Sequence, residues 1–412
     1  MHQIIFYIII GILIFDYILD QFLDYLNATK RSSVLPNELK GIYEEDKYKK
    51  SQDYDKANHK FSIITSSFNL VLILVFLYFS GFAFIDNMAR SYSSNSILIA
   101  LIFFGIIMFA SDIIHTPFNI YDTFIIEEKF GFNRTTVKTF ILDKFKGWLI
   151  AAFIGGGLLS LIIWFYNTVG QYFWVYAWIA VSLFMVFMTM FYTSLIVPLF
   201  NKLKPLEDGD LKEEITSFCK TTDFKLDNVF VIDGSKRSTK ANAYFSGLGK
   251  KKKIVLFDTL IKKLSKEEIV AVLAHEIGHY KKKHTLISIF TSIIQTGLTL
   301  FILSLFVGNP ELSKALGSDI PSFHLGLITF GFLYSPISTI IGLFMNIVSR
   351  KNEYAADQFA SEKYKGSYLQ NALKNLSVTN LSNLTPHPLY VFFNYSHPTL
   401  LQRLKFIDKF NK

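Results

Sequence analysis

The chain has 412 residues, 51% of them hydrophobic, and a formal net charge of +9 at pH 7. A mean hydropathy of +0.32 argues against a set of ordinary soluble domains, because a chain this apolar must bury much of its surface in lipid. Nucleic acid is not the expected partner of the positive charge, since the lysines and arginines are spread over loops and form no single basic patch.

Seven stretches contain the run of about 20 mostly apolar residues that a helix needs to cross a bilayer. The first carries Asp16 and Asp20, which lie four residues apart and so share a helical face that can point into the protein. It lacks a basic start and a small-residue cleavage site, so we interpret it as a retained helix and not a secretory signal. The predicted spans cover about 4–26, 61–85, 97–116, 147–167, 171–199, 285–307 and 323–349.

The basic residues alternate from loop to loop, which predicts the orientation. Eight lysines and arginines lie between the first two predicted spans, whereas the next loop has only Arg90. By the positive-inside rule the N-terminus lies outside the cytosol, and the 201–284 region and the C-terminal tail lie inside it. We expect the basic loops to face the anionic lipid of the bilayer.

Two regions are polar enough to fold in water, one on each side of the last predicted helical hairpin. The first holds two β-like runs, 229–232 and 253–257, and then a helix whose start has the capping-box residues Ser265 and Glu268. It also holds the single cysteine, Cys219, which excludes an intrachain disulfide and any zinc site of several cysteines. The predicted segments are 1–200 with five spans, 201–284 and 350–412 forming one α+β domain, and 285–349 with two spans.

An H-E-x-x-H pattern falls in the middle of the capped helix. His275 and His279 are four residues apart, so both rings can reach one Zn²⁺ from the same helical face. Glu276 is rotated off that face, where a general base can reach a metal-bound water. The alternative is a chance match, which arises in roughly one such sequence in a hundred.

A catalytic zinc needs a third protein ligand and an open fourth position. Glu353, at the start of the second polar region, is the candidate ligand. Asp357 shares its helical face and can accept the outward ring N–H of a ligating histidine, which would fix the histidine tautomer. The alternative for this pair is a solvated acidic face.

Three further polar residues are less clear from chemistry alone. His284 stands five residues after His279, so it is rotated off the ligand face, and we expect it at a membrane–water boundary. His397 and Arg403 can steady the oxyanion of a tetrahedral intermediate near a zinc ion. Their spacing alone favours a surface cap and a salt bridge.

Several other segments are typical of one family, so that the likeness extends over most of the chain. With them the chain resembles the type I CAAX prenyl endopeptidases, a family of membrane zinc metalloproteases. The resemblance implies seven long helices arranged as a barrel around a water-filled chamber, closed on the cytosolic side by a gluzincin-like zinc protease domain with one zinc ion. The segments are 117–121, 123–133, 198–203, 242–247, 352–357 and 396–398, besides the zinc helix.

The resemblance also implies roles that chemistry leaves open. His397 would stabilise the transition state and Arg403 would support it, while the stretch around Asn242 and Tyr244 would align the substrate as an added β-strand. Eukaryotic members remove the last three residues of prenylated CaaX proteins and can cut a second, upstream site. Because the chain is somewhat short and its end, 410–412, shows no retrieval signal, we place it in the bacterial branch. That branch predicts the bacterial inner membrane (the endoplasmic reticulum for a eukaryotic member) and a role in membrane-protein turnover.

We therefore predict a multi-pass membrane zinc endopeptidase that acts on peptide or protein substrates, lipidated ones included. Glu276 would take a proton from a zinc-bound water that attacks the peptide carbonyl with assistance from His397, and would then pass that proton to the leaving amine. A rival enzyme class is the shorter heat-shock type of membrane zinc protease, which has fewer spans. From another class comes a seven-span transporter or receptor with a structural zinc, which predicts a closed site of four ligands.

Overall fold

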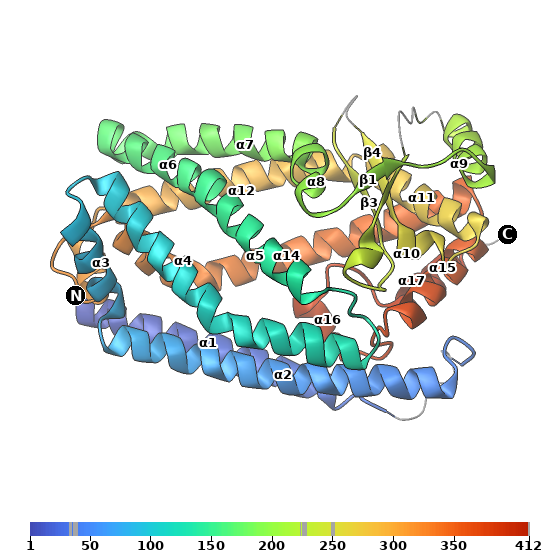
Figure 1. The fold of residues 1–412 in the computed structure, drawn as a ribbon, viewed down its shortest axis with the longest axis horizontal. Helices are drawn as coiled ribbons and strands as arrows, with labels where there is room; N and C mark the ends of the chain where they lie inside the picture. Colours follow the sequence, from blue (N-terminus) through green and yellow to red (C-terminus); the bar gives the residue numbers. More distant parts are fainter. Residues whose placement is uncertain (33–34, 36–39, 223, 225–228, 249–251, 411–412) are drawn as a thin grey trace.

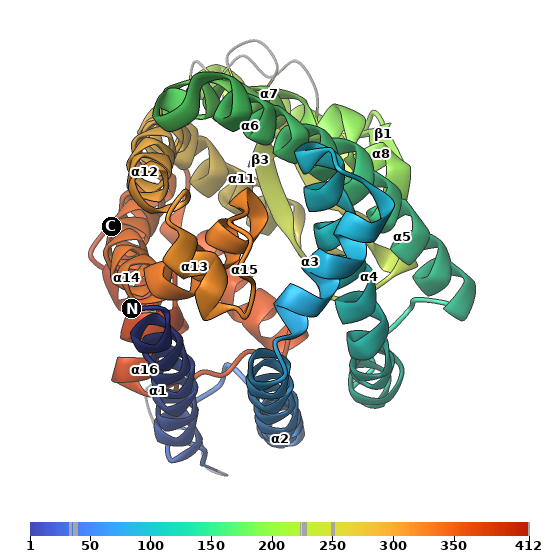
Figure 2. The same cartoon turned by 90° about the vertical axis from the view of Figure 1, so that its left-hand side faces the viewer.

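The computed structural model describes the chain except residues 33–34, 36–39, 223, 225–228, 249–251 and 411–412, so part of the C-terminal end discussed above lies outside the described residues. Long helices run along the molecule, and a small sheet with shorter helices gathers at one end (Figure 1). Viewed from the other end, the long helices form a ring (Figure 2). The ring agrees with the barrel that the resemblance implies.

The ring is built from neighbouring helices that contact one another in the order α2, α1, α14, α12, α7, α6 and α4. The π-helix η2, which continues α4, completes the ring by packing against α2. The long helices are α1 (His2–Ala28), α2 (Glu45–Tyr78), α4 (Ser96–Tyr121), α5 (Val137–Ile150), α6 (Gly156–Val169), α7 (Phe173–Leu195), α12 (His284–Phe306) and α14 (Phe323–Lys363). Their short links are α3 (Gly81–Tyr92), η2 (Asp122–Glu127), η3 (Ala151–Gly155), η4 (Gly170–Tyr172), α8 (Val197–Phe200) and α13 (Pro310–Ala315).

The predicted number of seven spans is not confirmed. In the described part of the chain six helical stretches are long and apolar enough to cross a membrane. Two predicted spans, 147–167 and 171–199, fall in one of these stretches, Val137–Phe200. That stretch folds back at Gly170, whose φ of 58° is left-handed, and α6 then packs against α7. The six stretches are His2–Ala28, Glu45–Tyr78, Ser96–Glu127, Val137–Phe200, His284–Phe306 and Phe323–Lys363.

The long helices expose many large apolar side chains, whereas an acid on the first of them is bonded to a neighbouring helix. Large side chains such as Phe22, Phe153 and Phe290 are exposed on these helices, which suits contact with lipid. Asp16, by contrast, accepts a hydrogen bond from Ser335 on α14 at 2.7 Å. This acid therefore faces the protein, as its sequence position predicts.

A four-stranded sheet forms one side of the polar domain, with strand order β1-β2-β4-β3. The predicted β-like runs are β2 and β4, which pair in parallel, whereas the sequence analysis did not identify β1. β3 is antiparallel to β4 and is an edge strand, because its other side has no partner strand among the described residues. The strands are β1 (Leu203–Pro205), β2 (Val229–Ile232), β3 (Ala243–Ser246) and β4 (Lys253–Phe257).

Helix α11 (Lys266–Lys281) packs on this sheet and carries the H-E-x-x-H pattern. Both capping-box hydrogen bonds form: Ser265 Oγ accepts from Glu268 N, and Glu268 Oε2 accepts from Ser265 N. Nearly every side of α11 is buried, since the sheet, α14 and smaller helices surround it. The smaller elements are α9 (Asp210–Thr221), η5 (Gly234–Lys236), α10 (Asp258–Ile261), α15 (Gly366–Thr379), α16 (Pro388–Asn394) and α17 (Leu400–Ile407).

Helix α14 runs without interruption from the ring into the polar domain over 41 residues. The predicted division between 349 and 350 therefore lies inside one helix, and Glu353 sits on the same rigid element as the last apolar stretch.

Candidate metal centre

The candidate metal ligands come from two helices that meet inside the polar domain (Figure 1). His275 and His279 lie one turn apart on α11, with their Nε2 atoms 3.1 Å from each other. Glu353 of α14 places Oε1 3.2 Å from His279 Nε2 and Oε2 3.4 Å from His275 Nε2. One ligand atom from each residue lies within 4.8 Å of the other two.

This arrangement fits a divalent metal ion. Glu353 is 4% exposed, and its Oε2 accepts no well-formed hydrogen bond among the described residues, although His275 Nε2 and Arg403 Nη1 lie 3.4 and 3.6 Å away; a bound cation would satisfy this buried oxygen. Two imidazole nitrogens and one carboxylate are also the ligand set of many catalytic zinc sites, which keep a fourth position open. Within the described chain no fourth histidine, cysteine or acid joins the group.

Asp357 and Arg403 form a hydrogen-bonded pair next to the Nδ1 side of His275. Asp357 is fully buried, with Oδ1 2.8 Å from His275 Nδ1. Arg403 donates to both carboxylate oxygens of Asp357, from Nε at 2.9 Å and from Nη2 at 2.6 Å. Burial disfavours a charged ring, yet the hydrogen bonds to Asp357 and Glu353 raise the pKa of His275 to about 9 in the metal-free site.

Glu276 and His397 are the two residues that the sequence analysis predicts to be catalytic. Glu276 follows His275 on α11 and is partly exposed. His397, from the loop before α17, is 62% exposed at its side chain and places Nε2 3.4 Å from Glu353 Oε1. His397 therefore lies next to one candidate ligand, and Glu276 lies on the helix that carries the other two.

Sequence reasoning placed His284 at a membrane–water boundary and did not consider Gly278, yet both residues shape the site. Lys283 has a left-handed φ of 61°, and the turn brings His284 back so that its Nδ1 lies 3.0 Å from His279 Nδ1. His284 thus contacts the outward nitrogen of a predicted ligand, as well as starting a membrane helix. Gly278 allows α11 and α14 to touch, because a Cβ there would lie 3.1 Å from Ala356 Cα. The glycine within the H-E-x-x-H motif was the only sequence signal for this close approach, and it can be interpreted only once the helix that crosses there is known.

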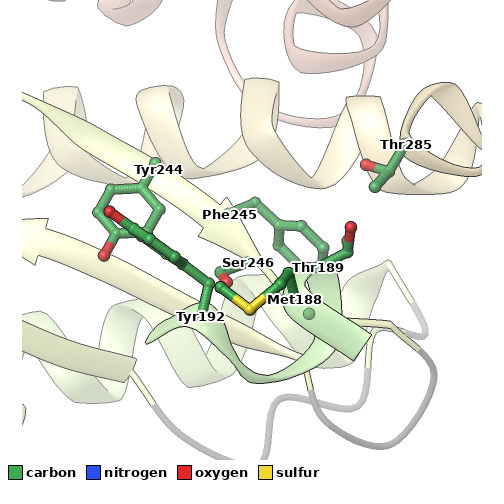
Figure 3. A pocket seen from close by; sticks show the side chains of 8 residues that line it. Met188, Thr189, Tyr192, Tyr244, Phe245, Ser246 and Thr285 are labelled. Carbon is green, nitrogen blue, oxygen red and sulfur yellow. The ribbon is translucent and has the colours of Figure 1, made fainter. Parts of the chain in front are cut away.

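The predicted substrate residues Asn242 and Tyr244 lie beside the metal-binding helix but do not bond to its ligands. β3 packs against α11, where the ring of Phe245 lies 5.6 Å from that of Tyr280. Tyr244 points the other way, into a pocket of about 460 Å³ between β3, α7 and the start of α12 (Figure 3). No hydrogen bond or ring contact joins Asn242 or Tyr244 to the three candidate ligands among the described residues.

Comparison with known proteins gives consistent matches over the whole chain. Residues 24–202 match the model of the CAAX prenyl protease N-terminal region with five membrane helices, and residues 205–411 match peptidase family M48. A CAAX prenyl protease 1 homolog of Arabidopsis thaliana is 35% identical over 97% of this chain and 96% of its own length. For CAAX prenyl protease 1 of Saccharomyces cerevisiae the values are 35%, 97% and 94%.

The fold is also similar to a solved structure. The crystal structure of S. mikatae Ste24p superposes with a TM-score of 0.93 at 33% identity, covering 98% of this chain and 99% of that one. These relatives are eukaryotic, so the prediction of a bacterial member, made from chain length and the C-terminal end, has no support from them.

Proposed function

The chain belongs to peptidase family M48 and is an integral membrane metalloendopeptidase of the CAAX prenyl protease type; from this premise we propose that it uses zinc to cleave prenylated peptides near their C-terminus. The observation that carries the proposal is the convergence of His275, His279 and Glu353 on one point beside an exposed face. The names of the relatives support prenylated CaaX substrates.

In the proposed reaction each residue has a distinct task. Zinc, held by His275, His279 and Glu353, would polarise the peptide carbonyl and lower the pKa of water. Glu276 accepts the proton of the attacking water and delivers it to the leaving amine. His397 donates a hydrogen bond to the carbonyl oxygen as negative charge develops there.

Asp357 and Arg403 orient the candidate ligand His275. The Asp357 carboxylate holds the proton of His275 on Nδ1, so the lone pair of Nε2 faces the metal position. Arg403 compensates the buried charge of Asp357 and lies 3.6 Å from Glu353 Oε2 with its Nη1.

The free edge of β3 supports binding of the substrate as an added strand. An edge strand offers unpaired N–H and C=O groups, and β3 lies next to the helix that carries the ligands. We propose that residues 242–246 pair with the substrate main chain, with Asn242 and Tyr244 at this edge.

The remaining topology belongs to the same proposal. If Val137–Phe200 crosses the bilayer twice, through α6 and α7, the chain has seven spans, an N-terminus outside the cytosol and a cytosolic metal domain. The alternatives find no support: a structural zinc site needs a fourth ligand, and the match over nearly the whole chain is to CAAX prenyl proteases and not to the shorter heat-shock type.

The test compares a farnesylated CaaX peptide with its unmodified twin, using purified protein and quenched-fluorescence reporters. We expect the farnesylated peptide to be cleaved with the higher kcat/KM. Glu276→Gln should keep zinc and lose almost all turnover, whereas His279→Ala should lose both. Cleavage at the wild-type rate by Glu276→Gln would refute the mechanism, and equal kcat/KM for the two peptides would refute the substrate class.

A further inference from the structure

Two stretches have no role in the chemistry above: 117–133, which joins the family-typical segments 117–121 and 123–133, and the family-typical segment 198–203. The structure brings both to one place, the β3 lead-in, which we define as residues 233–242 directly before the edge strand. The lead-in leaves β2 and passes along the ring before it delivers β3 to α11. Its contacts with the ring decide where β3 begins.

Arg237 is the first anchor of the β3 lead-in. It donates to both carboxylate oxygens of Asp143 on α5, from Nε at 2.8 Å and from Nη2 at 2.9 Å. It also donates from Nη1 to Asn201 Oδ1 at 3.0 Å and from Nη2 to the carbonyl oxygen of Phe200 at 2.9 Å. One guanidinium group therefore holds the lead-in to α5 and to the segment 198–203.

Main-chain pairing holds the middle of the lead-in against the other segment. The Arg134 N–H donates to the Arg237 carbonyl, and the Thr239 N–H donates to the Phe132 carbonyl, both at 3.0 Å. Asn133 and Ser238 form the antiparallel bridge between these two bonds. The end of segment 117–133 thus acts as a short partner strand.

Lys240 is the second anchor. Its Nζ lies 2.9 Å from Glu127 Oε2, at the end of η2, and 2.9 Å from the hydroxyl of Tyr54 on α2. The ammonium also lies 4.5 Å from the ring centroid of Phe132, within cation–π distance. Glu127 and Tyr54 are themselves hydrogen-bonded to each other, so one lysine ties together α2, η2 and the lead-in.

The residue after Lys240 is fixed as well. Asn380 accepts from the Ala241 N–H at 3.1 Å and donates to the Ala241 carbonyl at 3.3 Å. Beyond it, β3 is held by its pairing with β4 and by Ser246, which bonds to Thr193 on α7. The start of the edge strand is therefore fixed to several helices of the ring.

From these contacts we infer that Arg237 and Lys240 are positioning residues, which hold the free edge of β3 at the distance from α11 that substrate pairing requires. The inference rests on the proposed function, because it assumes that the substrate pairs with β3. Tyr54, Glu127 and Asp143 belong to three different apolar stretches, so the two anchors join the start of β3 to three parts of the membrane region.

The inference is tested by breaking the Lys240 ion pair from each side. Lys240→Met keeps the side-chain stem, and Glu127→Gln keeps the shape of the acid, but each removes the ion pair. We expect KM for the farnesylated reporter to rise about tenfold with kcat changed less than about twofold, because a displaced edge strand weakens ground-state and transition-state binding alike. The double variant should be no worse than either single variant, since one interaction is lost in all three.

Controls separate positioning from general damage. Lys240→Arg keeps a cation beside Glu127 and should retain most of the affinity. Asp210→Asn breaks another lysine–carboxylate pair, Lys266 with Asp210 at 3.0 Å, which touches neither β3 nor the lead-in, and should leave KM unchanged. Zinc content should stay at the wild-type level in every variant.

Three outcomes would overturn the inference. They are an unchanged KM in both Lys240→Met and Glu127→Gln, a fall in kcat at constant KM, and a loss of zinc that matches the loss of activity. These outcomes leave the proposed function intact as long as the wild-type protein cleaves the reporter. A wild-type protein that fails to cleave it would overturn both.

Discussion

The most informative single substitution in the metal centre is Asp357→Asn. The Asp357 carboxylate is 0% exposed and accepts from His275 Nδ1 at 2.8 Å and from Arg403 Nη2 and Nε at 2.6 and 2.9 Å. An asparagine with its oxygen toward His275 keeps two of these contacts, but its amide NH₂ then meets the Arg403 Nε–H, donor against donor. In the reverse orientation the NH₂ faces His275 Nδ1 and forces the ring proton onto Nε2, where the metal binds.

The magnitude follows from the interactions that are lost. One hydrogen bond between charged groups is worth about 1.5–3 kcal/mol, and the loss of a carboxylate behind a ligating histidine weakens metal binding about 10- to 100-fold. A hundredfold loss corresponds to about 2.7 kcal/mol, so the two estimates agree. Because every asparagine orientation costs a contact, we expect the upper end of this range for Asp357→Asn.

The assay is a zinc titration of metal-free protein against a fluorescent chelator, at fixed pH. Saturating zinc should restore most of the turnover, because Asp357 does not face the substrate side. Glu362→Gln is the matched control, since Glu362 is an exposed acid on the same helix that accepts one hydrogen bond from Gln358 at 2.8 Å. A zinc affinity of Asp357→Asn within twofold of this control, or a loss of turnover that zinc does not restore, would refute the reasoning.

Three further predictions follow from the same geometry. His397→Ala should lower kcat about 10²- to 10³-fold with KM and zinc content nearly unchanged, because the exposed ring acts on developing charge, and a raised KM at constant kcat would contradict this role. The raised pKa of His275, about 9 in the metal-free site, means that below this pH zinc must displace a proton from the ring. Zinc affinity should therefore rise about tenfold per pH unit up to about pH 9 and then level off. Zinc affinities that do not change across a series of titrations at different pH would count against this prediction. Gly278→Ala should lower the free energy of unfolding by about 1–3 kcal/mol and weaken zinc binding, as measured by thermal unfolding and zinc titration. Gly331→Ala is the control: no atom lies within 4 Å of its added Cβ, so both quantities should stay at the wild-type value.

The elements that local sequence determines were predicted well. The capping box at Ser265 and Glu268 set the start of α11, and alternation and β-branched residues identified β2 and β4. β1, at Leu203–Pro205, is only three residues long, and the sheet forms it by pairing with β2. The formation of so short a strand depends on pairing with its neighbour, and no local sequence pattern predicts it.

Spacing within a helix carries information that spacing between helices does not. The geometry of His275 and His279 follows from a separation of four residues, whatever the rest of the fold does. The meeting of Glu353 with them depends on how α11 and α14 cross, and chemistry could only name Glu353 as a candidate. Gly278 lies at this crossing and allows the two helices to approach, but its effect cannot be predicted until both helices are placed.

Dividing the chain at residue 350 hides the fact that Glu353 lies on a helix that begins inside the ring. Ser335, which bonds to Asp16 of α1, and Glu353 lie 18 residues apart on α14, about 27 Å along one continuous helix. The carboxylate ligand is therefore located by packing inside the ring as well as by the polar domain. β3 is tied to the long helices through Arg237 and Lys240, so the positions of both Glu353 and β3 depend on contacts with those helices. A metal domain cut away from those helices would keep His275 and His279 on α11 but lose what aligns the third ligand and the substrate strand with them.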